Sequence, residues 1–287
     1  MARPLRIQGP GLTYHITARG VRRTSIYLDD DDRQRFLTLL AAVIERYALR
    51  CHAYCEMTNH YHLAVTTTDA NLSHAVQQLN GDYAQWWNWR HQRSGHVFQA
   101  RFHAQIVQDE AYLVNVCRYI VLNPLRAGIV DSPEEWPWSS YRAMIGIAIQ
   151  PFLDSDRLRE VLAPGDPSVG AARFRDCVSA VDTEPPRLPA AAILGDDDFI
   201  AAMQARRGRV SREVPRRECR RSLDAIFRGA ISRPARDHAI VVAYRERFAM
   251  AEIARYLELH PSTVTKIVAR GPDREKAALS RPDPRPR

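Results

Sequence analysis

Two histidines, His60 and His62, stand two residues apart, and imidazole is a common ligand of divalent metal ions in proteins. On a β-strand, side chains with this spacing project from the same face. The apolar residues Tyr61, Leu63 and Val65 alternate with them, which predicts a core-facing side and an opposite, open side that carries the histidines. The pair therefore predicts half of a metal site, although cross-strand packing or a solvated face also accommodates this spacing.

A second pair, Tyr119 and Asn123, lies before Pro124 in a segment with helical character. Residues four apart lie on one face of a helix, so a phenol and an amide can address one point. Tyr112 projects within about 20° of Tyr119, because seven residues make nearly two turns. Spacing alone therefore leaves two tyrosine candidates, and a packing role for either one also fits.

The elements that must position these residues follow from the hydrophobic periodicity and from turn signals. Helix 31–48 begins with acidic residues, which suit the helix dipole, and Asn71 or Ser73 is the expected N-cap of helix 71–92. We expect the last helix to end, or to be distorted, at Asn123-Pro124. The order β-α-β-β-α-β-α predicts an α+β domain with a ferredoxin-like antiparallel sheet. The predicted elements are strand 13–19, helix 31–48, strands 49–56 and 60–67, helix 71–92, strand 97–107 and helix 109–122.

Residues 1 to about 145 resemble the IS200-like, REP-associated tyrosine transposases, the Y1 group of the HUH single-strand nuclease superfamily. Six blocks carry the resemblance, in the same order along the chain. They are residues 1–7, 14–20, 52–63, 95–102, 118–128 and 136–141.

The resemblance implies a division of labour among the candidate residues. It carries over His60 and His62 as metal ligands, Tyr119 as the nucleophile and Asn123 as a further ligand. Two imidazoles and one amide leave room for water and a phosphate oxygen, which suits Mg²⁺ or Mn²⁺ better than a closed zinc site. It also implies a single-stranded or hairpin DNA substrate, including REP-like palindromes, and a 5′-phosphotyrosine intermediate. Arg101 and Arg126 are candidate phosphate contacts.

The basic charge of the chain is concentrated at its C-terminal end. Residues 206–287 hold 21 Lys and Arg against 10 Asp and Glu, whereas the remaining residues are slightly acidic, so a polyanion such as nucleic acid is a natural partner. Helical patterning returns after Ser222, and Ser262 is the expected cap of a second helix in a helix-turn-helix. Residues 211–272 resemble the DnaA-type or Trp-repressor-type DNA-binding domains, which implies binding to double-stranded DNA; a plain helical hairpin also fits. The candidate DNA contacts are Thr263, Thr265, Lys266 and Arg270.

The predicted organisation is a catalytic domain over residues 1–148, a connector over 149–210, the helix-turn-helix domain over 211–272 and a disordered basic tail over 273–287. No apolar run long enough to span a membrane and no secretory signal are present, so we expect no membrane partner and a cytoplasmic, nucleoid-associated protein. Five scattered cysteines without a C-x-x-C pair favour reduced thiols. A monomer and a homodimer both fit.

Three function classes follow from these observations. The favoured one is a metal-dependent enzyme that nicks and joins single-stranded DNA through a tyrosine nucleophile. The alternative is a sequence-specific DNA-binding regulator whose first domain is catalytically silent. The third is a metal phosphoesterase that uses water, which predicts multiple turnover and no covalent intermediate.

Overall fold

The computed structural model describes residues 7–108, 111–180, 188, 191–206, 223–230, 232–245, 248 and 250–268. The chain divides into two units, residues 1–217 and 218–287, and each is described by itself. The predicted tail over 273–287 lies outside the described residues. Among the helices described, none combines the length and the apolar character that a bilayer crossing requires.

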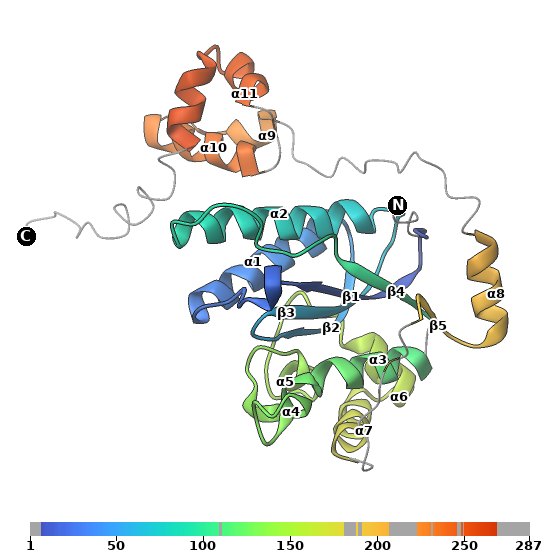
Figure 1. Ribbon diagram of the computed structural model, residues 1–287. Coiled ribbons are helices and arrows are strands. Elements are labelled where there is room, and N and C mark those ends of the chain that lie inside the picture. The colour runs from blue at the N-terminus through green and yellow to red at the C-terminus, as the bar shows by residue number, and fades with distance from the viewer. Residues whose placement is uncertain are drawn as a thin grey trace, which may run out of the picture. The chain divides into compact units, whose positions relative to one another are not determined.

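A five-stranded sheet organises the first unit (Figure 1). Its order is β2-β3-β1-β4-β5, and the neighbouring strands are antiparallel except for β4 and β5, which run parallel. The predicted α+β class is confirmed, but the expectation of an entirely antiparallel sheet is wrong at the β5 edge. The strands are β1 (Thr13–Arg19), β2 (Arg50–Glu56), β3 (His60–Thr66), β4 (His103–Val107) and β5 (Ile193–Leu194).

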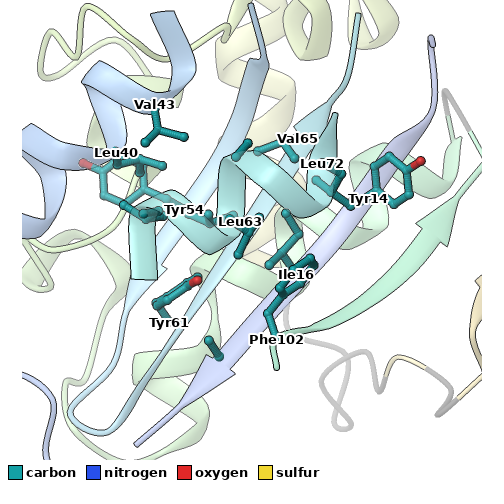
Figure 2. Close-up of a cluster of buried hydrophobic side chains, with 14 of the residues drawn as sticks. Tyr14, Ile16, Leu40, Val43, Tyr54, Tyr61, Leu63, Val65, Leu72 and Phe102 are labelled. Carbon is teal, nitrogen blue, oxygen red and sulfur yellow. The ribbon is translucent and has the colours of Figure 1, made fainter. Parts of the chain in front are cut away.

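Helices α1 (Asp30–Arg46) and α2 (Leu72–Arg90) cover one face of this sheet (Figure 1). The apolar side chains of the alternating strands point towards them, as the periodicity predicts, and Tyr61, Leu63 and Val65 are almost completely buried there. Figure 2 shows this cluster, in which Leu40 and Val43 of α1 lie over the strands. Burial of this apolar surface fixes the register of β3, because a slip by one residue would exchange its two faces.

The other face is also covered, which contradicts the open side predicted for the histidines. Helix α3 (Ala111–Val121) lies against it together with α6 (Asp156–Leu162) and α7 (Pro167–Ser179), and a second apolar cluster forms there. Ala64 is fully buried in this cluster, and His62 is only 5% exposed. The second layer comes from segments far along the chain, and the local alternation of β3 contains no information about them. Short helices α4 (Asn123–Arg126), η2 (Pro133–Glu135) and α5 (Tyr141–Met144) belong to the same unit.

The helix starts agree in part with the sequence signals. The Asp29 carboxylate accepts a hydrogen bond from the backbone N–H of Asp32 and caps α1, whose first turn is acidic. At α2, neither predicted cap acts: Asn71 makes no capping bond, and the Gln8 side chain accepts from the Ser73 N–H instead. The cap is therefore supplied by a residue 65 positions away, which local sequence does not indicate.

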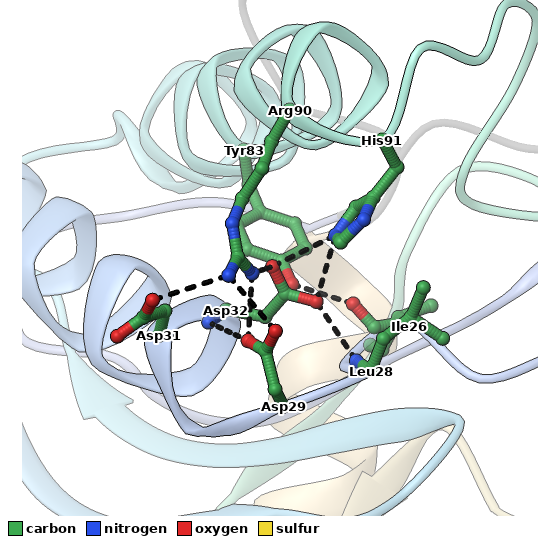
Figure 3. A network of polar contacts seen from close by, with 8 residues as sticks. All are labelled: Ile26, Leu28, Asp29, Asp31, Asp32, Tyr83, Arg90 and His91. Carbon is green, nitrogen blue, oxygen red and sulfur yellow. Dashed lines mark hydrogen bonds and ion pairs between the residues drawn. The ribbon is translucent and has the colours of Figure 1, made fainter.

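A polar network joins the start of α1 to the end of α2 (Figure 3). Arg90 pairs with Asp29, Asp31 and Asp32, and His91 also contacts the Asp32 carboxylate. The Oδ2 atom of Asp32 accepts a hydrogen bond from the Leu28 backbone N–H at 2.8 Å. The network thereby holds the loop that follows β1 against both helices.

The segment predicted as a connector contributes to the fold of the first unit. Strand β5 pairs with β4 through the bonds Ile106 N–H to Ala192 O and Gln108 N–H to Leu194 O, and α6 and α7 pack in the second apolar cluster. Helix α8 (Asp197–Arg206) follows β5. The predicted strand 97–107 is shorter than expected, since the chain joins the sheet only from His103, apart from one bridge between Phe98 and Gly20.

The second unit is helical in its described parts. Its helices α9 (Leu223–Phe227), α10 (Arg233–Arg245), α11 (Met250–Tyr256) and a helical stretch over 261–268 surround a small core that includes Ile240, Ile253 and Val264. The predicted cap Ser262 is wrong: the His260 ring accepts from the Ser262 N–H at 3.3 Å, and helical structure begins at 261. Residues 257–260 break the helical structure between α11 and the stretch over 261–268.

Candidate functional site

The paired histidines lie at the start of β3, under α3. His60 and His62 have ring centroids 4.9 Å apart and planes at 73° to each other. His62 is almost completely buried, whereas His60 is half-buried. Strand β1 runs beside them, and Arg19 is the register partner of His60. At the end of β1, Gly20 is required by space, because a Cβ there would lie 2.3 Å from the Thr24 carbonyl oxygen.

Helix α3 brings Tyr119 to the histidines. The Tyr119 ring lies 5.8 Å from the His62 ring and 5.7 Å from the His15 ring, both edge-on. The other tyrosine candidate, Tyr112, lies about two turns earlier on α3 and is 36% exposed. The structure thus brings together Tyr119, His60 and His62, which the sequence singled out, and adds His15.

Helical hydrogen bonding continues past Asn123-Pro124, but the helix is distorted there. Helix α3 stops at Val121 and α4 starts at Asn123, while the Leu122 N–H still bonds to the Arg118 carbonyl at 3.1 Å. The Asn123 amide donates to the carbonyl oxygens of Tyr119 at 2.8 Å and Ile120 at 3.3 Å. The side-chain oxygen of Asn123 therefore points away from these two backbone carbonyls. Ligation of a metal by Asn123 stays a prediction.

Positive charge surrounds the site. The Arg126 guanidinium lies 4.8 Å from the centre of the Tyr119 ring, within cation–π range. Arg19 and Arg126 both act electrostatically on His62. The positive charge of these two arginines attracts an anion such as a phosphodiester. A metal cation held by neutral ligands beside them would also need an anion nearby to offset the positive charge.

Burial keeps the histidines neutral. Desolvation lowers the pKa of His15 and of His60 to about 4, with a smaller contribution from Arg19 at His60. Desolvation also lowers the pKa of His62 well below its usual value, and the neighbouring His15 and His60 add to this effect. A neutral imidazole keeps one nitrogen lone pair, which is the state that binds a metal.

One buried atom fits a missing ligand. Nε2 of His62 is inaccessible to solvent and has no hydrogen-bond partner among the described residues, although a buried polar atom is usually satisfied. Within the described part of the chain, no three His, Cys, Asp or Glu side chains are arranged so that they could hold a metal ion together. The neutral imidazoles of His60 and His62 would suit an ion that completes its shell with amide, water or phosphate oxygens, such as Mg²⁺ or Mn²⁺.

Sequence reasoning missed three residues that surround the histidines. His15 contacts His62 across the sheet, Gln105 contacts His15, and Asn59 contacts His60. A weak signal existed in β1, where the polar Thr13, His15 and Thr17 alternate with apolar residues. Nothing local identified Gln105, because its contact depends on the register between β1 and β4.

The predicted DNA contacts are dispersed. Arg101 is exposed in the segment before β4. In the second unit, Thr265 and Lys266 are exposed and Thr263 is half-buried, while Arg270 lies outside the described residues. The Thr265 hydroxyl donates within its own helix to the Pro261 carbonyl at 3.1 Å.

Comparison with known proteins finds similar sequences for part of the first unit. Residues 10–123 match the family model described as "Transposase IS200 like". A Haemophilus influenzae protein named as a REP-associated tyrosine transposase is 26% identical over 140 residues, which span 45% of this chain and 79% of that protein. Residues 10–123 are thus similar to the IS200-like transposases. The resemblance of the chain to the REP-associated tyrosine transposases is confirmed.

A solved structure, titled as a REP-associated tyrosine transposase bound to a REP hairpin, is also similar. It is 19% identical and aligns with a TM-score of 0.46, covering 53% of this chain and 90% of the other. The match of the family model ends at the residue that starts α4, so β5 and the helices after α4 lie beyond it.

Proposed function

We propose that this IS200-like region is a metal-dependent endonuclease and strand transferase for single-stranded DNA, with Tyr119 as its nucleophile. The observation that carries the proposal is the edge-on approach of the Tyr119 ring to His62, whose buried Nε2 lacks a partner. A nucleophile beside a cation site is the pairing that phosphoryl transfer requires.

In this proposal His60, His62 and Asn123 hold Mg²⁺ or Mn²⁺. The ion supplies Lewis-acid stabilisation of the charge that develops on the phosphoryl oxygens. The chain's own residues do the rest. Arg126, over the Tyr119 ring, and Arg19 attract the phosphodiester, and α3 holds the phenol beside the histidines.

The covalent step is balanced by a leaving hydroxyl. The Tyr119 oxygen loses its proton to a base and forms a bond to phosphorus, while the bond from phosphorus to the 3′ oxygen breaks. That oxygen takes up a proton and leaves as a 3′-hydroxyl, and the 5′-phosphate stays on Tyr119. Attack by the 3′-hydroxyl of another strand reverses the step and joins DNA without ATP.

The proposed substrate is hairpin DNA of the REP type. This follows from the name of the Haemophilus influenzae relative and from the domain family. We also propose that the order β2-β3-β1-β4 is the ferredoxin-like arrangement, and that residues 250–268 form a helix-turn-helix for double-stranded DNA. A DNA substrate places the protein in the cytoplasm, at the nucleoid.

The decisive experiment is a search for the covalent adduct. The full chain is incubated with hairpin oligonucleotides and Mg²⁺ or Mn²⁺, and adducts are separated under denaturing conditions and mapped by mass spectrometry. We expect a 5′-phosphotyrosine at Tyr119, its complete loss in Tyr119→Phe and its retention in the matched control Tyr112→Phe. An adduct in Tyr119→Phe would contradict the nucleophile assignment.

A second candidate function is a sequence-specific DNA-binding regulator with a silent first domain. The exposed Thr265 and Lys266 on the stretch 261–268 favour it. Binding of duplex DNA without cleavage of any hairpin would support this candidate. Multiple turnover with release of a free 5′-phosphate and no adduct would support a phosphoesterase that uses water.

A further inference from the structure

Each of the two histidines is hydrogen-bonded at Nδ1, and both bonds lead to a side-chain amide that is anchored on a backbone carbonyl. We propose that Asn59, and His15 together with Gln105, are positioning residues that hold His60 and His62 in the tautomer with hydrogen on Nδ1. Both Nε2 atoms then carry the lone pair that a divalent cation needs. The inference deepens the proposed function and depends on its metal site.

At His60 the arrangement is direct. The Asn59 amide nitrogen donates to the Arg23 carbonyl oxygen at 3.0 Å. Because a carbonyl oxygen only accepts, the atom facing it is the NH₂ group, and the amide oxygen is the atom that lies 2.7 Å from Nδ1 of His60. An amide oxygen also only accepts, so Nδ1 carries the hydrogen and Nε2 is the bare nitrogen.

At His62 the same argument applies, with the His15 ring between the amide and the ligand. The Gln105 amide nitrogen donates to the Ala191 carbonyl at 2.6 Å, which turns its oxygen to Nδ1 of His15 at 3.0 Å. Nδ1 of His15 therefore carries the hydrogen, and its Nε2 accepts. That atom lies 2.9 Å from Nδ1 of His62, which must be the donor.

The ring geometry supports this hydrogen bond. The planes of His15 and His62 differ by only 8°, with centroids 5.2 Å apart. A separation of 2.9 Å between two ring nitrogens of nearly parallel rings matches an edge-to-edge hydrogen bond, not contact between ring faces. The consequence is the bare, buried Nε2 of His62, which no group in the described part of the chain satisfies.

The two anchors come from different parts of the first unit. Arg23 belongs to the short helix η1 (Val21–Arg23) after β1, within the matched transposase domain. Ala191 precedes β5, which lies beyond residues 10–123. Gln105 and Ala191 are held together by the pairing of β4 and β5, including the bond from the Ile106 N–H to the Ala192 carbonyl at 2.9 Å. The added edge strand therefore completes the support of one of the two ligands.

Such supporting bonds are typical of metal-binding histidines, and losing one generally costs about 10- to 100-fold in metal affinity. The physical reason is that the wrong tautomer must be converted before an ion can bind. A merely structural role for these residues would leave the tautomers unchanged.

The test reads the tautomers in the metal-free full chain. Histidine is labelled with ¹⁵N, long-range proton–nitrogen correlations are recorded at pH 7, and signals are assigned with His15→Gln, His60→Gln and His62→Gln. We expect Nδ1–H with a lone pair on Nε2 at all three rings. Hydrogen on Nε2 of His60 or of His62 in the wild type would overturn the proposal, and this measurement requires no variant other than those used for assignment.

Two variants then separate the two supports. Gln105→Leu should mix the tautomers of His15 and His62 and leave His60 as it was, whereas Asn59→Leu should affect His60 alone. Each should raise the dissociation constant for Mn²⁺, measured by paramagnetic resonance, about tenfold. The matched control Gln150→Leu removes an amide that donates to the Tyr54 hydroxyl, and it should change neither readout.

The outcomes distinguish this inference from the proposed function. Correct tautomers in a wild type that binds no Mn²⁺ would support the positioning arrangement and contradict the metal site. Unchanged tautomers and Mn²⁺ affinity in both variants would overturn the positioning roles and leave the proposed function intact.

Discussion

The two units place their candidate functional groups in opposite environments. In the first unit the groups lie between a sheet and α3, and the buried His62 is fixed by bonds that run through His15 to Gln105. In the second unit, Thr265 and Lys266 lie on an exposed helical surface. Chemistry on a phosphodiester requires fixed geometry, whereas attraction to a DNA backbone requires only accessible charge. We therefore expect large single-residue effects in the first unit and small, salt-dependent ones in the second.

The strongest test of this contrast is His62→Ala. Loss of a central ligand should lower strand cleavage by at least about 100-fold and abolish the response to added Mg²⁺ or Mn²⁺, because the remaining imidazole binds the ion weakly. Cleavage rates and Mn²⁺ titrations of the variant check this expectation.

The matched control is His52→Ala, which also removes a buried imidazole from the sheet but one that bonds to Thr66. It should retain metal-stimulated cleavage once its stability is taken into account. Equal loss in both variants would show that the site depends on the fold of the sheet in general, and the contrast between the units would fail.

How much of this site the sequence predicts depends on the range of the contacts. Alternation within β3 and spacing within α3 pointed to His60 and His62 and to two tyrosines, Tyr112 and Tyr119, because those signals are local. The choice of Tyr119 came from the family resemblance. The pairing of His15 with Gln105 joins residues 90 positions apart and depends on strand register. Strand β5 has only two residues, too few for a periodic pattern, so its place at the edge of β4 was not predicted.

The fold follows the same rule. The strand over Thr13–Arg19 was predicted with its observed bounds, since alternation and flanking residues agree. The start of β4 was predicted too early in the chain. Val97 and Phe102 are apolar and buried, as strand residues often are, but they do not pair regularly with a neighbouring strand. The sequence did not predict that the histidine-bearing face of the sheet is covered, because α3, α6 and α7 reach that face only through tertiary packing.

Arg126→Ala tests the contrast between the two units with an effect of intermediate size. The guanidinium over the Tyr119 ring contributes charge without being fixed as a ligand, so we expect about a tenfold fall in single-turnover cleavage. The control is Arg118→Ala, which removes a guanidinium from α3 that donates to the Ala180 carbonyl. A loss in Arg118→Ala as large as in Arg126→Ala would argue for a general effect of positive charge.

Burial in the first unit should also appear as a pH-dependent stability. Desolvation raises the pKa of Glu56 well above its usual value of 4.5, and the nearby Arg33 offsets this only in part. The folded state thus binds a proton that the unfolded state releases above about pH 4.5, so the contribution of Glu56 to stability falls as the pH rises. Glu56→Gln should match the wild type at pH 4 and exceed it increasingly towards pH 8.

Thermal unfolding from pH 4 to pH 8 measures the difference, with the exposed Glu45→Gln as a surface control. The opposite trend, with Glu56→Gln less stable at neutral pH, would mean that Glu56 and Arg33 form a favourable ion pair at their separation of 3.9 Å. The buried Glu56 would then be stabilised as a carboxylate paired with Arg33 and not as a neutral carboxylic acid.

The smallest effect is expected in the second unit. Lys266→Ala should weaken binding to a mixed-sequence duplex a few-fold and reduce the salt slope by about one, since one phosphate contact is lost. Thr265→Ala should change less, because that hydroxyl is already bonded within its helix. Neither should alter cleavage of a hairpin by the first unit. If Lys266→Ala instead abolished hairpin cleavage, the chemistry would depend on the exposed surface, and the division of work between a buried centre and an accessible one would have to be abandoned.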